Sequence, residues 1–553
     1  MHDIWLFLEE PDHFSASCPV VDQTAKHTVM ACKGLSKVKD TRLLIRDGNP
    51  AVYGIKTNKK NLDLKNQLIK ITFGKRDPTK DNKTILIVGE TGTGKSTLIN
   101  AMVNYVLGVK RKDKVWFEIV KTENTQTESQ TTAVTVYEVF GYEGLRVPYS
   151  LTLIDTPGYG DTRGIQEDKL IAEKLYELFR SENGIHNIDA VCLVVKASMN
   201  RLSERQQYIF DAVVSIFGKD MDKSIVALIT HSDGMPPKNA LQAIIKAKIP
   251  CAKNRKGQPV HFVFNNRQSE CIEEECESRQ RNAWKQGFKA LKMFFSTLNQ
   301  MEKKSVMMTE GVLRQRKHLE SLVSNLQDRI KEIELKQKEI KGTQIALEKH
   351  TKDMEENKDF SYKVEEVYKE KVPIEASSIW PLNKGATICT ICEENCHYPD
   401  CWWVSNLSWC SAMKNEQCTV CTKKCHYTKH IKVKEIYVSK SRQVSRTFNN
   451  LKQKYEINKQ AAGEKMNVLS ELQKQLEDLT SMKTSHVEES FQCVIELELI
   501  ALKVTSLNTA RILDFLIEKM NEIGDTEKVN KLEQIKKAEK RKDSKIKGSS
   551  STK

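Results

Sequence analysis

The chain has 553 residues, which is too many for one hydrophobic core, so we expect several structural units. No apolar run approaches the roughly 18 residues of a membrane span, and the first apolar run is flanked by acidic residues, unlike a signal peptide. We therefore expect a cytoplasmic protein whose 15 cysteines stay reduced.

The formal net charge of +15 is concentrated near the C-terminus. Residues 528–553 contain ten Lys or Arg and three Asp or Glu, a net +7. We predict a basic disordered tail over residues 521–553, and binding of this tail to anionic lipid or RNA is an alternative use of its charge. At the other end, residues 1–40 show no clear periodicity and are predicted to be poorly ordered.

Residues 42–56 contain two strand-like runs around a Gly-Asn-Pro turn, and they lead into a buried strand at residues 84–88. The next residues, from Gly89 to Ser96, fit the pattern G-x-x-x-x-G-K-[ST] at every fixed position, and apolar residues then recur at helical spacing. Bare glycine backbone and a helix N-terminus can surround a polyphosphate with N–H groups. Lys95 would add a cation between the β- and γ-phosphates, and the Ser96 hydroxyl would bind Mg²⁺.

A hydroxyl-rich loop precedes the strand predicted at residues 132–140. In a G-protein fold this loop supplies a threonine that senses the γ-phosphate and Mg²⁺. Thr131 and Thr132 are the candidates, and we favour Thr132 as the Mg²⁺ ligand. The alternative is a threonine-rich loop that merely starts the strand.

Asp155 ends the strand predicted at residues 151–155, and Gly158 follows three positions later. A carboxylate at the carboxyl end of a sheet strand can order the Mg²⁺ water, and the Gly158 N–H can bond the γ-phosphate. The next residue, Tyr159, cannot polarise water as a glutamine would, so hydrolysis requires another group. The candidates for catalysis are Lys95, Thr132, Asp155 and Gly158.

Strands and helices alternate from residue 191 to residue 299, which predicts an α/β fold with a mostly parallel sheet and helices on both faces. The strand at residues 225–230 is followed by His231 and Asp233. A carboxylate here can accept both N1–H and the exocyclic amine of guanine, while His231 stands where a lysine usually stacks on the base. Asp233 as a simple helix N-cap is the alternative. Asn265 or Asn266 stands where the last base-contacting loop belongs.

These segments, in order GETGTGKSTLIN, SQTTAVTVYEV, IDTPGYGDTRG, THSDG and FNN, resemble the septin-like and GIMAP (AIG)-type G-domain proteins over about residues 35–299. The resemblance implies a P-loop G domain, with its lead-in, over residues 41–300 and self-association through the nucleotide face. Thr230 and His231 depart from the usual N-K-x-D pattern, so the resemblance implies phosphate binding more firmly than guanine selectivity. It implies GTP/GDP and Mg²⁺ contacts at Gly89, Glu90, Thr91, Gly92, Thr93, Gly94, Lys95, Ser96, Thr97, Asp155, Gly158, His231, Asp233 and Asn265.

From Met307 the composition changes to Glu, Lys, Gln and Leu, with apolar residues at spacings of three and four. We predict a stalk helix over residues 301–358, a strand pair enclosing a Cys/His-rich module over residues 359–440, and returning helices over residues 441–520. The simplest geometry is an antiparallel coiled-coil hairpin with the module at its tip. A helix of about 50 residues would hold that tip about 75 Å from the G domain.

The module contains the pattern C-x2-C-x3-C-H-x3-[CH] twice, 29 positions apart. Thiolates and imidazoles in this spacing are preferred ligands of structural Zn²⁺, whereas disulfides are disfavoured in a reducing compartment. Unligated structural thiols are the other alternative, and whether each repeat closes on itself or the two cross-brace stays open. The candidate zinc ligands are Cys389, Cys392, Cys396 and Cys401 in the first repeat and Cys418, Cys421, Cys425 and His430 in the second.

The sequence therefore predicts a GTP-binding protein with a nucleotide-switched G domain and slow hydrolysis that controls self-association or the binding of a partner, for which the stalk tip is one surface. One rival is a nucleotide-binding scaffold without turnover that acts through its stalk and zinc module. The other rival is an ATPase.

Overall fold

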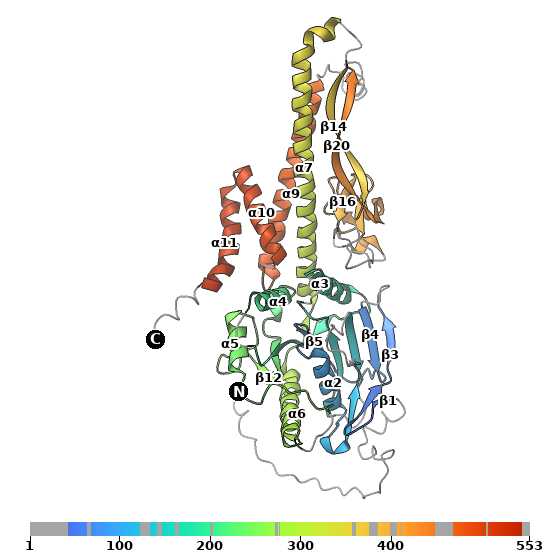
Figure 1. The fold of residues 1–553 in the computed structure, drawn as a ribbon, viewed down its shortest axis with the longest axis vertical. Coiled ribbons are helices and arrows are strands. Elements are labelled where there is room, and N and C mark those ends of the chain that lie inside the picture. Colours follow the sequence, from blue (N-terminus) through green and yellow to red (C-terminus); the bar gives the residue numbers. More distant parts are fainter. Residues whose placement is uncertain are drawn as a thin grey trace.

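The computed structural model has a globular N-terminal body from which an elongated helical stalk rises (Figure 1). The residues that the structure describes are 42–62, 68–121, 133–140, 146–160, 165–199, 203–270, 275, 277–356, 361–374, 385–398, 406–410, 412–447, 468–504 and 507–544.

An eight-stranded sheet forms the centre of the body, in the order β12-β11-β10-β5-β8-β7-β4-β3. Neighbouring strands are parallel except for the pairs β7–β8 and β3–β4, as the prediction of a mostly parallel sheet requires. The strands are β3 (Asn58–Asn61), β4 (Leu68–Phe73), β5 (Asn82–Gly89), β7 (Val134–Val139), β8 (Ser150–Asp155), β10 (Ala190–Lys196), β11 (Ile225–Thr230) and β12 (His261–Val263).

Helices cover both faces of this sheet, which confirms the predicted α/β class (Figure 1). Helices α2 (Lys95–Val106) and α6 (Glu277–Gln300) pack on one face, and α3 (Ile165–Arg180), α4 (Glu204–Val214) and α5 (Lys238–Lys246) pack on the other. Successive residues of a strand point to opposite faces, so Ile85 and Ile87 join the first core while Leu86 and Val88 join the second. Burial on both faces is the reason that residues 85–88 of β5 are all apolar.

A second, three-stranded sheet lies beside the body and confirms the two strand-like runs of the lead-in. Strand β1 (Arg42–Arg46) pairs antiparallel with β2 (Ala51–Ile55), and β2 pairs parallel with β6 (Val115–Glu118). The short elements of the body are η2 (Arg111–Asp113), β9 (Asn187–Ile188), η3 (Lys219–Met221) and β13 (Lys304–Ser305).

The stalk is built from α7 (Met307–Glu356) and α9 (Val468–Ile500), which pack against each other and against α10 (Leu507–Ile523). The prediction of returning helices over residues 441–520 is wrong at its start. Residues 441–447 belong to strand β20 (Glu435–Thr447), because they pair with β14 (Ser361–Pro373). Helices α9 (Val468–Ile500) and α10 (Leu507–Ile523) agree with the prediction over the later part of this range.

The prediction that the Cys/His-rich module sits at the stalk tip is also wrong. The long ribbon of β14 and β20 turns back along α7, so that the module lies close to the G domain (Figure 1). The Arg180 guanidinium on α3 of the G domain donates a hydrogen bond to the Trp409 carbonyl oxygen in the module, 2.6 Å away. The module elements are β15 (Ala386–Cys389), β16 (Glu394–His397), η5 (Leu407–Trp409), β17 (Met413–Lys414), β18 (Gln417–Cys418), η6 (Tyr427–Lys429) and β19 (His430–Val433).

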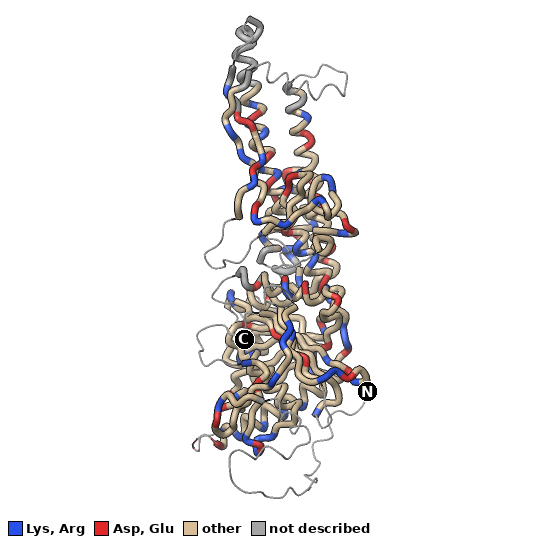
Figure 2. The backbone as a smooth tube through the Cα atoms, turned by 90° about the vertical axis from the view of Figure 1, so that its right-hand side faces the viewer, with Lys and Arg blue, Asp and Glu red and all other residues tan. Residues whose placement is uncertain are grey.

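The predicted disordered tail over residues 521–553 needs correction as well, because helix α11 (Thr526–Ser544) occupies most of it. Val529, Leu532 and Ile535 recur at helical spacing and are buried in the core of the stalk. Lysines of α11 pair with acidic residues, Lys528 with Glu488 at 2.6 Å and Lys531 with Glu498 at 2.8 Å. Basic and acidic residues are interspersed along the described stalk (Figure 2). Part of the basic charge of this segment is therefore paired within the protein.

None of the helices in the described ranges combines the length and apolar character that a membrane crossing requires.

Candidate functional site

The predicted phosphate-binding loop connects β5 to α2 at the carboxyl edge of the main sheet. Gly92 and Gly94 have φ values of 74° and 84°, which other residues adopt only with strain. A Cβ on Gly89 would lie 2.5 Å from the Val194 carbonyl oxygen of β10. The local fold therefore requires glycine at the positions that the sequence pattern marks.

Lys95 opens α2, and its side chain lies within the loop. Its ammonium donates hydrogen bonds to the carbonyl oxygens of Gly89 and Glu90, both 3.1 Å away. Burial lowers the pKa of Lys95 to about 8, and the charges of Asp155 and Glu90 oppose this shift. Ser96 and Thr97 follow in the first turn of α2.

Asp155 is fully buried at the end of β8, the strand adjacent to β5. The segment after it lies against the loop: the Tyr159 N–H donates to the Gly89 carbonyl oxygen at 3.1 Å, and the Thr91 N–H donates to the Tyr159 carbonyl oxygen at 3.2 Å. A Cβ on Gly158 would lie 2.5 Å from the Thr91 Cα. Gly158 is thus in van der Waals contact with the loop, as a glycine that bonds a γ-phosphate must be close to it. The favoured Thr132 and its neighbour Thr131 lie outside the described residues.

A cavity of about 700 Å³ extends from the start of α2 to the ends of β11 and β12. It brings together five of the predicted contacts: Gly94, Thr97, His231, Asp233 and Asn265. The Thr230 hydroxyl donates to the Thr93 carbonyl oxygen at 2.6 Å and thereby ties the end of β11 to the loop. Burial, together with the charges of Lys196 and Arg267, lowers the pKa of His231, so its ring is neutral near pH 7.

The cavity is also lined by residues that the sequence patterns did not single out, among them Asn100, Trp116, Glu118 and Arg267. Asn100 joins α2 to the segment after β6: its side chain accepts from the Val120 N–H at 3.0 Å and donates to the Val120 carbonyl oxygen at 2.9 Å. Asn266, the second asparagine of the pair considered above, has both amide atoms buried without a hydrogen-bond partner in the described part of the chain. Its place just after the predicted strand end was the sequence signal for it.

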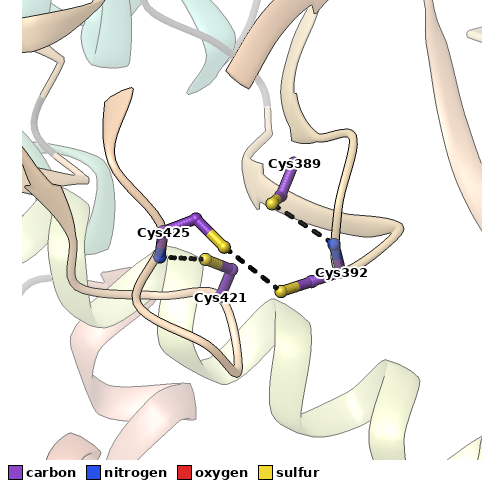
Figure 3. A group of neighbouring side chains, drawn as sticks. All are labelled: Cys389, Cys392, Cys421 and Cys425. Atoms are coloured by element: carbon purple, nitrogen blue, oxygen red, sulfur yellow. Dashed lines mark hydrogen bonds between the residues drawn. The ribbon is translucent and has the colours of Figure 1, made fainter. Parts of the chain in front are cut away.

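The Cys/His-rich module contains two groups of potential metal ligands among the residues described. One group is Cys389, Cys392, Cys421 and Cys425, and the other is Cys396, Cys418, Cys421 and His430. Within each group the ligand atoms all lie within 4.8 Å of one another. The side chains of the first group come from two separate loops and point toward a common centre (Figure 3).

The two repeats therefore cross-brace, and neither repeat closes on itself. The reason is strand pairing, because β15 of the first repeat pairs with β19 of the second and sets Cys389 opposite His430. Seven of the eight predicted ligands are in these groups, while Cys401 lies outside the described residues. Such groups of soft ligands can hold a metal ion.

The AIG1 family model matches residues 83–284 of the chain. No curated protein matches the sequence significantly. Among solved structures, Toc33 from Arabidopsis thaliana in complex with GDP and Mg²⁺ is 19% identical, with a TM-score of 0.24, and the match covers 38% of this chain and 84% of that one. Toc33 in complex with Mg²⁺ and GMPPNP is 18% identical, with a TM-score of 0.25 and coverage of 40% and 88%.

These two structural matches are too weak to assign a fold or a function. The assignment of the domain therefore depends on the family model and on the fold described above. Residues 83–284 match the AIG1 family model and have the fold of a P-loop G domain, and together these findings support a GTP-binding protein.

Proposed function

We propose that this chain is a GTP-dependent switch with slow hydrolysis, whose nucleotide state controls self-association or the binding of a partner. The observation that carries the proposal is the cavity that joins the phosphate-binding loop to Asp233 and Asn265. A phosphate-binding loop and an adjoining polar cavity at one sheet edge are the two parts that a nucleotide site requires.

In this proposal the residues from Gly89 to Thr97 hold the phosphates. Loop N–H groups and the N-terminus of α2 face the negative charge, and the Lys95 ammonium moves from the loop carbonyls to the phosphate oxygens. The Ser96 hydroxyl and Asp155 would hold Mg²⁺, directly or through water, and Thr132 would complete this set. Mg²⁺ would neutralise charge on the phosphates.

In this proposal Asp233 selects the base, and His231, Asn265 and Asn266 line the same cavity. The carboxylate can accept the two N–H groups of guanine, whereas adenine presents an unprotonated N1 at that position. A buried amide without a hydrogen-bond partner costs roughly 1–3 kcal/mol. A hydrogen bond from the Asn266 side chain to a ligand in the cavity would remove this cost.

Slow hydrolysis follows from the residue after Gly158. Tyr159 is only 1% exposed and packs in the core on the α3 side of the sheet. It therefore does not orient an attacking water. Backbone groups, the threonine-rich loop or a partner would have to orient that water instead.

The structure suggests how the nucleotide state would reach the stalk. Arg205 on α4 bonds the Gly160 carbonyl oxygen and lies 3.7 Å from the Glu90 carboxylate of the loop. The same helix pairs with the stalk through Asp211 and Lys503, 2.5 Å apart. A rearrangement of the segment after Asp155 would thus act on a helix that holds the stalk base.

For the Cys/His-rich module we propose zinc in a structural role. Each ligand group already has four members, which leaves no open position for a reacting water. The module is held on three sides, by Arg180 of α3, by the ion pair of Arg329 on α7 with Glu394, and by the pair of Lys424 with Glu489 on α9 at 2.8 Å. A metal-stabilised module at this place would fasten the stalk to the G domain.

Guanine selectivity gives the direct test of the nucleotide proposal. The purified chain should bind GTP at least about tenfold more tightly than ATP, because each unsatisfied polar contact in the base site costs over about 1.4 kcal/mol. The change Asp233→Asn should lower the affinity for GTP and raise the affinity for xanthosine triphosphate. An amide can accept a hydrogen bond from N1–H and donate one to the xanthine 2-oxygen. Equilibrium competition with a fluorescent nucleotide measures both effects.

Asp222→Asn in the loop after η3 is the matched control, because Asp222 does not line the cavity, and it should leave both affinities unchanged. A preference of the unmodified chain for ATP would overturn guanine selectivity, and phosphate release from ATP would then establish the ATPase alternative. GTP binding without phosphate release over hours would favour the scaffold alternative, in which the stalk and module act without turnover.

A further inference from the structure

The Cys/His-rich module places one thiol in two ligand groups at once. We propose that the module binds two tetrahedral metal ions of the zinc class that share the Cys421 thiolate as a bridging ligand. This inference rests on the metal-binding role proposed above and adds the number of ions, their ligand sets and the bridge.

The number of ligands in the two groups favours a shared one. Two four-coordinate ions need eight ligand positions, and the two groups contain seven side chains. The Cys421 sulfur is within 4.8 Å of every ligand atom in both groups. Cys421 is fully buried between them, as a bridging ligand must be.

The first group has the dimensions of a tetrahedral thiolate site. The sulfur atoms of Cys392 and Cys425, which come from different repeats, are 3.7 Å apart. A tetrahedron with metal–sulfur bonds of about 2.3 Å has edges of about 3.8 Å. Figure 3 shows the side chains of Cys389, Cys392, Cys421 and Cys425 gathered between two chain segments, with the sulfur atoms of Cys392 and Cys425 facing each other.

The second group contains an oriented histidine. His430 is 3% exposed, and its Nδ1 donates to the His426 carbonyl oxygen at 3.1 Å. That bond leaves the lone pair on Nε2, which is buried and has no hydrogen-bond partner among the residues described. A metal-ligating histidine shows this arrangement, with one nitrogen held by a carbonyl and the other directed to the ion.

Backbone N–H groups point at the sulfurs that would be thiolates. The Cys425 N–H donates to the Cys421 sulfur at 3.2 Å, and the Cys421 and Val420 N–H groups donate to the Cys418 sulfur at 3.3 and 3.4 Å. In the first repeat the Cys392 N–H donates to the Cys389 sulfur at 3.4 Å. Such donors stabilise the negative charge that remains when six thiolates bind two divalent ions.

The competing arrangement uses Cys401 as an eighth ligand, so that each ion has four ligands of its own. The metal content of the purified full-length chain separates the two. We expect two zinc ions per chain in the wild type and in Cys401→Ser, but less than one in Cys421→Ser, because that change removes a ligand from both ions. Loss of an ion from Cys401→Ser, or one tightly held ion in Cys421→Ser, would overturn the bridge.

A measurement on the unmodified sequence guards against misfolding of the variants. With both ions replaced by cadmium-113, a shared thiolate couples the two nuclei, and each cadmium NMR signal should be split by the other. Two unsplit signals would overturn the bridge while leaving the metal proposal intact. Absence of metal from the wild-type chain would instead overturn the metal proposal, and the bridge with it.

Discussion

Replacing Lys95 with alanine should lower the affinity for GTP by at least about 100-fold. The ammonium lies inside the phosphate-binding loop, 3.1 Å from two loop carbonyl oxygens, and it is 6% exposed. A charge-assisted bond between a buried cation and a phosphate contributes about 3 kcal/mol, and each 1.4 kcal/mol is tenfold in affinity. Titration calorimetry with GTP and Mg²⁺ measures the loss, and phosphate release should fall to background.

The matched control is Lys246→Ala, which removes an exposed lysine at the end of α5 and should leave GTP affinity unchanged. The melting temperature of Lys95→Ala should stay close to that of the wild type, because the hydrogen bonds of this ammonium within the described residues go to carbonyl oxygens of its own loop. Unchanged GTP affinity in a folded Lys95→Ala protein would contradict the assignment of the phosphate site.

The second large effect is expected at the base of the stalk, from Arg316→Ala. The Arg316 guanidinium on α7 donates to the carbonyl oxygens of Ser215, Val504 and Lys503, at 3.0, 2.8 and 2.5 Å, and to the Thr509 hydroxyl at 2.8 Å. One side chain thus joins the end of α4 to the segment between α9 and α10. Alanine leaves these acceptors without their donor, which should destabilise the junction by roughly 3–5 kcal/mol.

Denaturant unfolding and limited proteolysis between α9 and α10 would measure the change. Arg316→Lys should recover only part of the stability, because an ammonium cannot match the planar fork of a guanidinium. Arg314→Ala on the same helix is the matched control, since Arg314 makes no hydrogen bond within the described ranges. An Arg316→Ala protein that unfolds and is cleaved like the wild type would show that the junction does not depend on this residue.

The nucleotide site was largely predictable because most of its phosphate-binding residues are consecutive in the sequence. The strand, glycine turn and helix around Gly89–Ser96 are neighbours in the chain, so their pattern alone indicates their fold. Asp155 and Asp233 are far from the loop in sequence, but each follows a buried strand, and a parallel sheet brings such strand ends to one edge. Asn266 was harder to distinguish from Asn265, because only side-chain packing determines which amide is buried in the cavity.

The stalk predictions failed where local pattern and tertiary contact disagree. Residues 441–447 precede a helical apolar pattern, yet they form a strand because β14 supplies thirteen paired residues across the ribbon. Helix α11 was predicted as a disordered segment because of its many charged residues. Val529, Leu532 and Ile535 nevertheless have helical spacing in the sequence. Arg329 interrupted the apolar seam of α7, and the structure shows that it is buried in an ion pair with Glu394 of the module.

The amino-acid sequence by itself determined that the chain has a phosphate-binding loop in an α/β domain and two Cys/His repeats after that domain. Both features are short-range patterns of residue type. Three-dimensional packing alone decides that the module lies against the G domain, that the repeats cross-brace and that Cys421 belongs to both groups. Those outcomes depend on pairings between distant segments, such as that of Cys389 with His430. No local sequence pattern indicates which distant strand each of these segments pairs with. The free energy that selects such a pairing comes from burial and hydrogen bonds formed only after the segments meet.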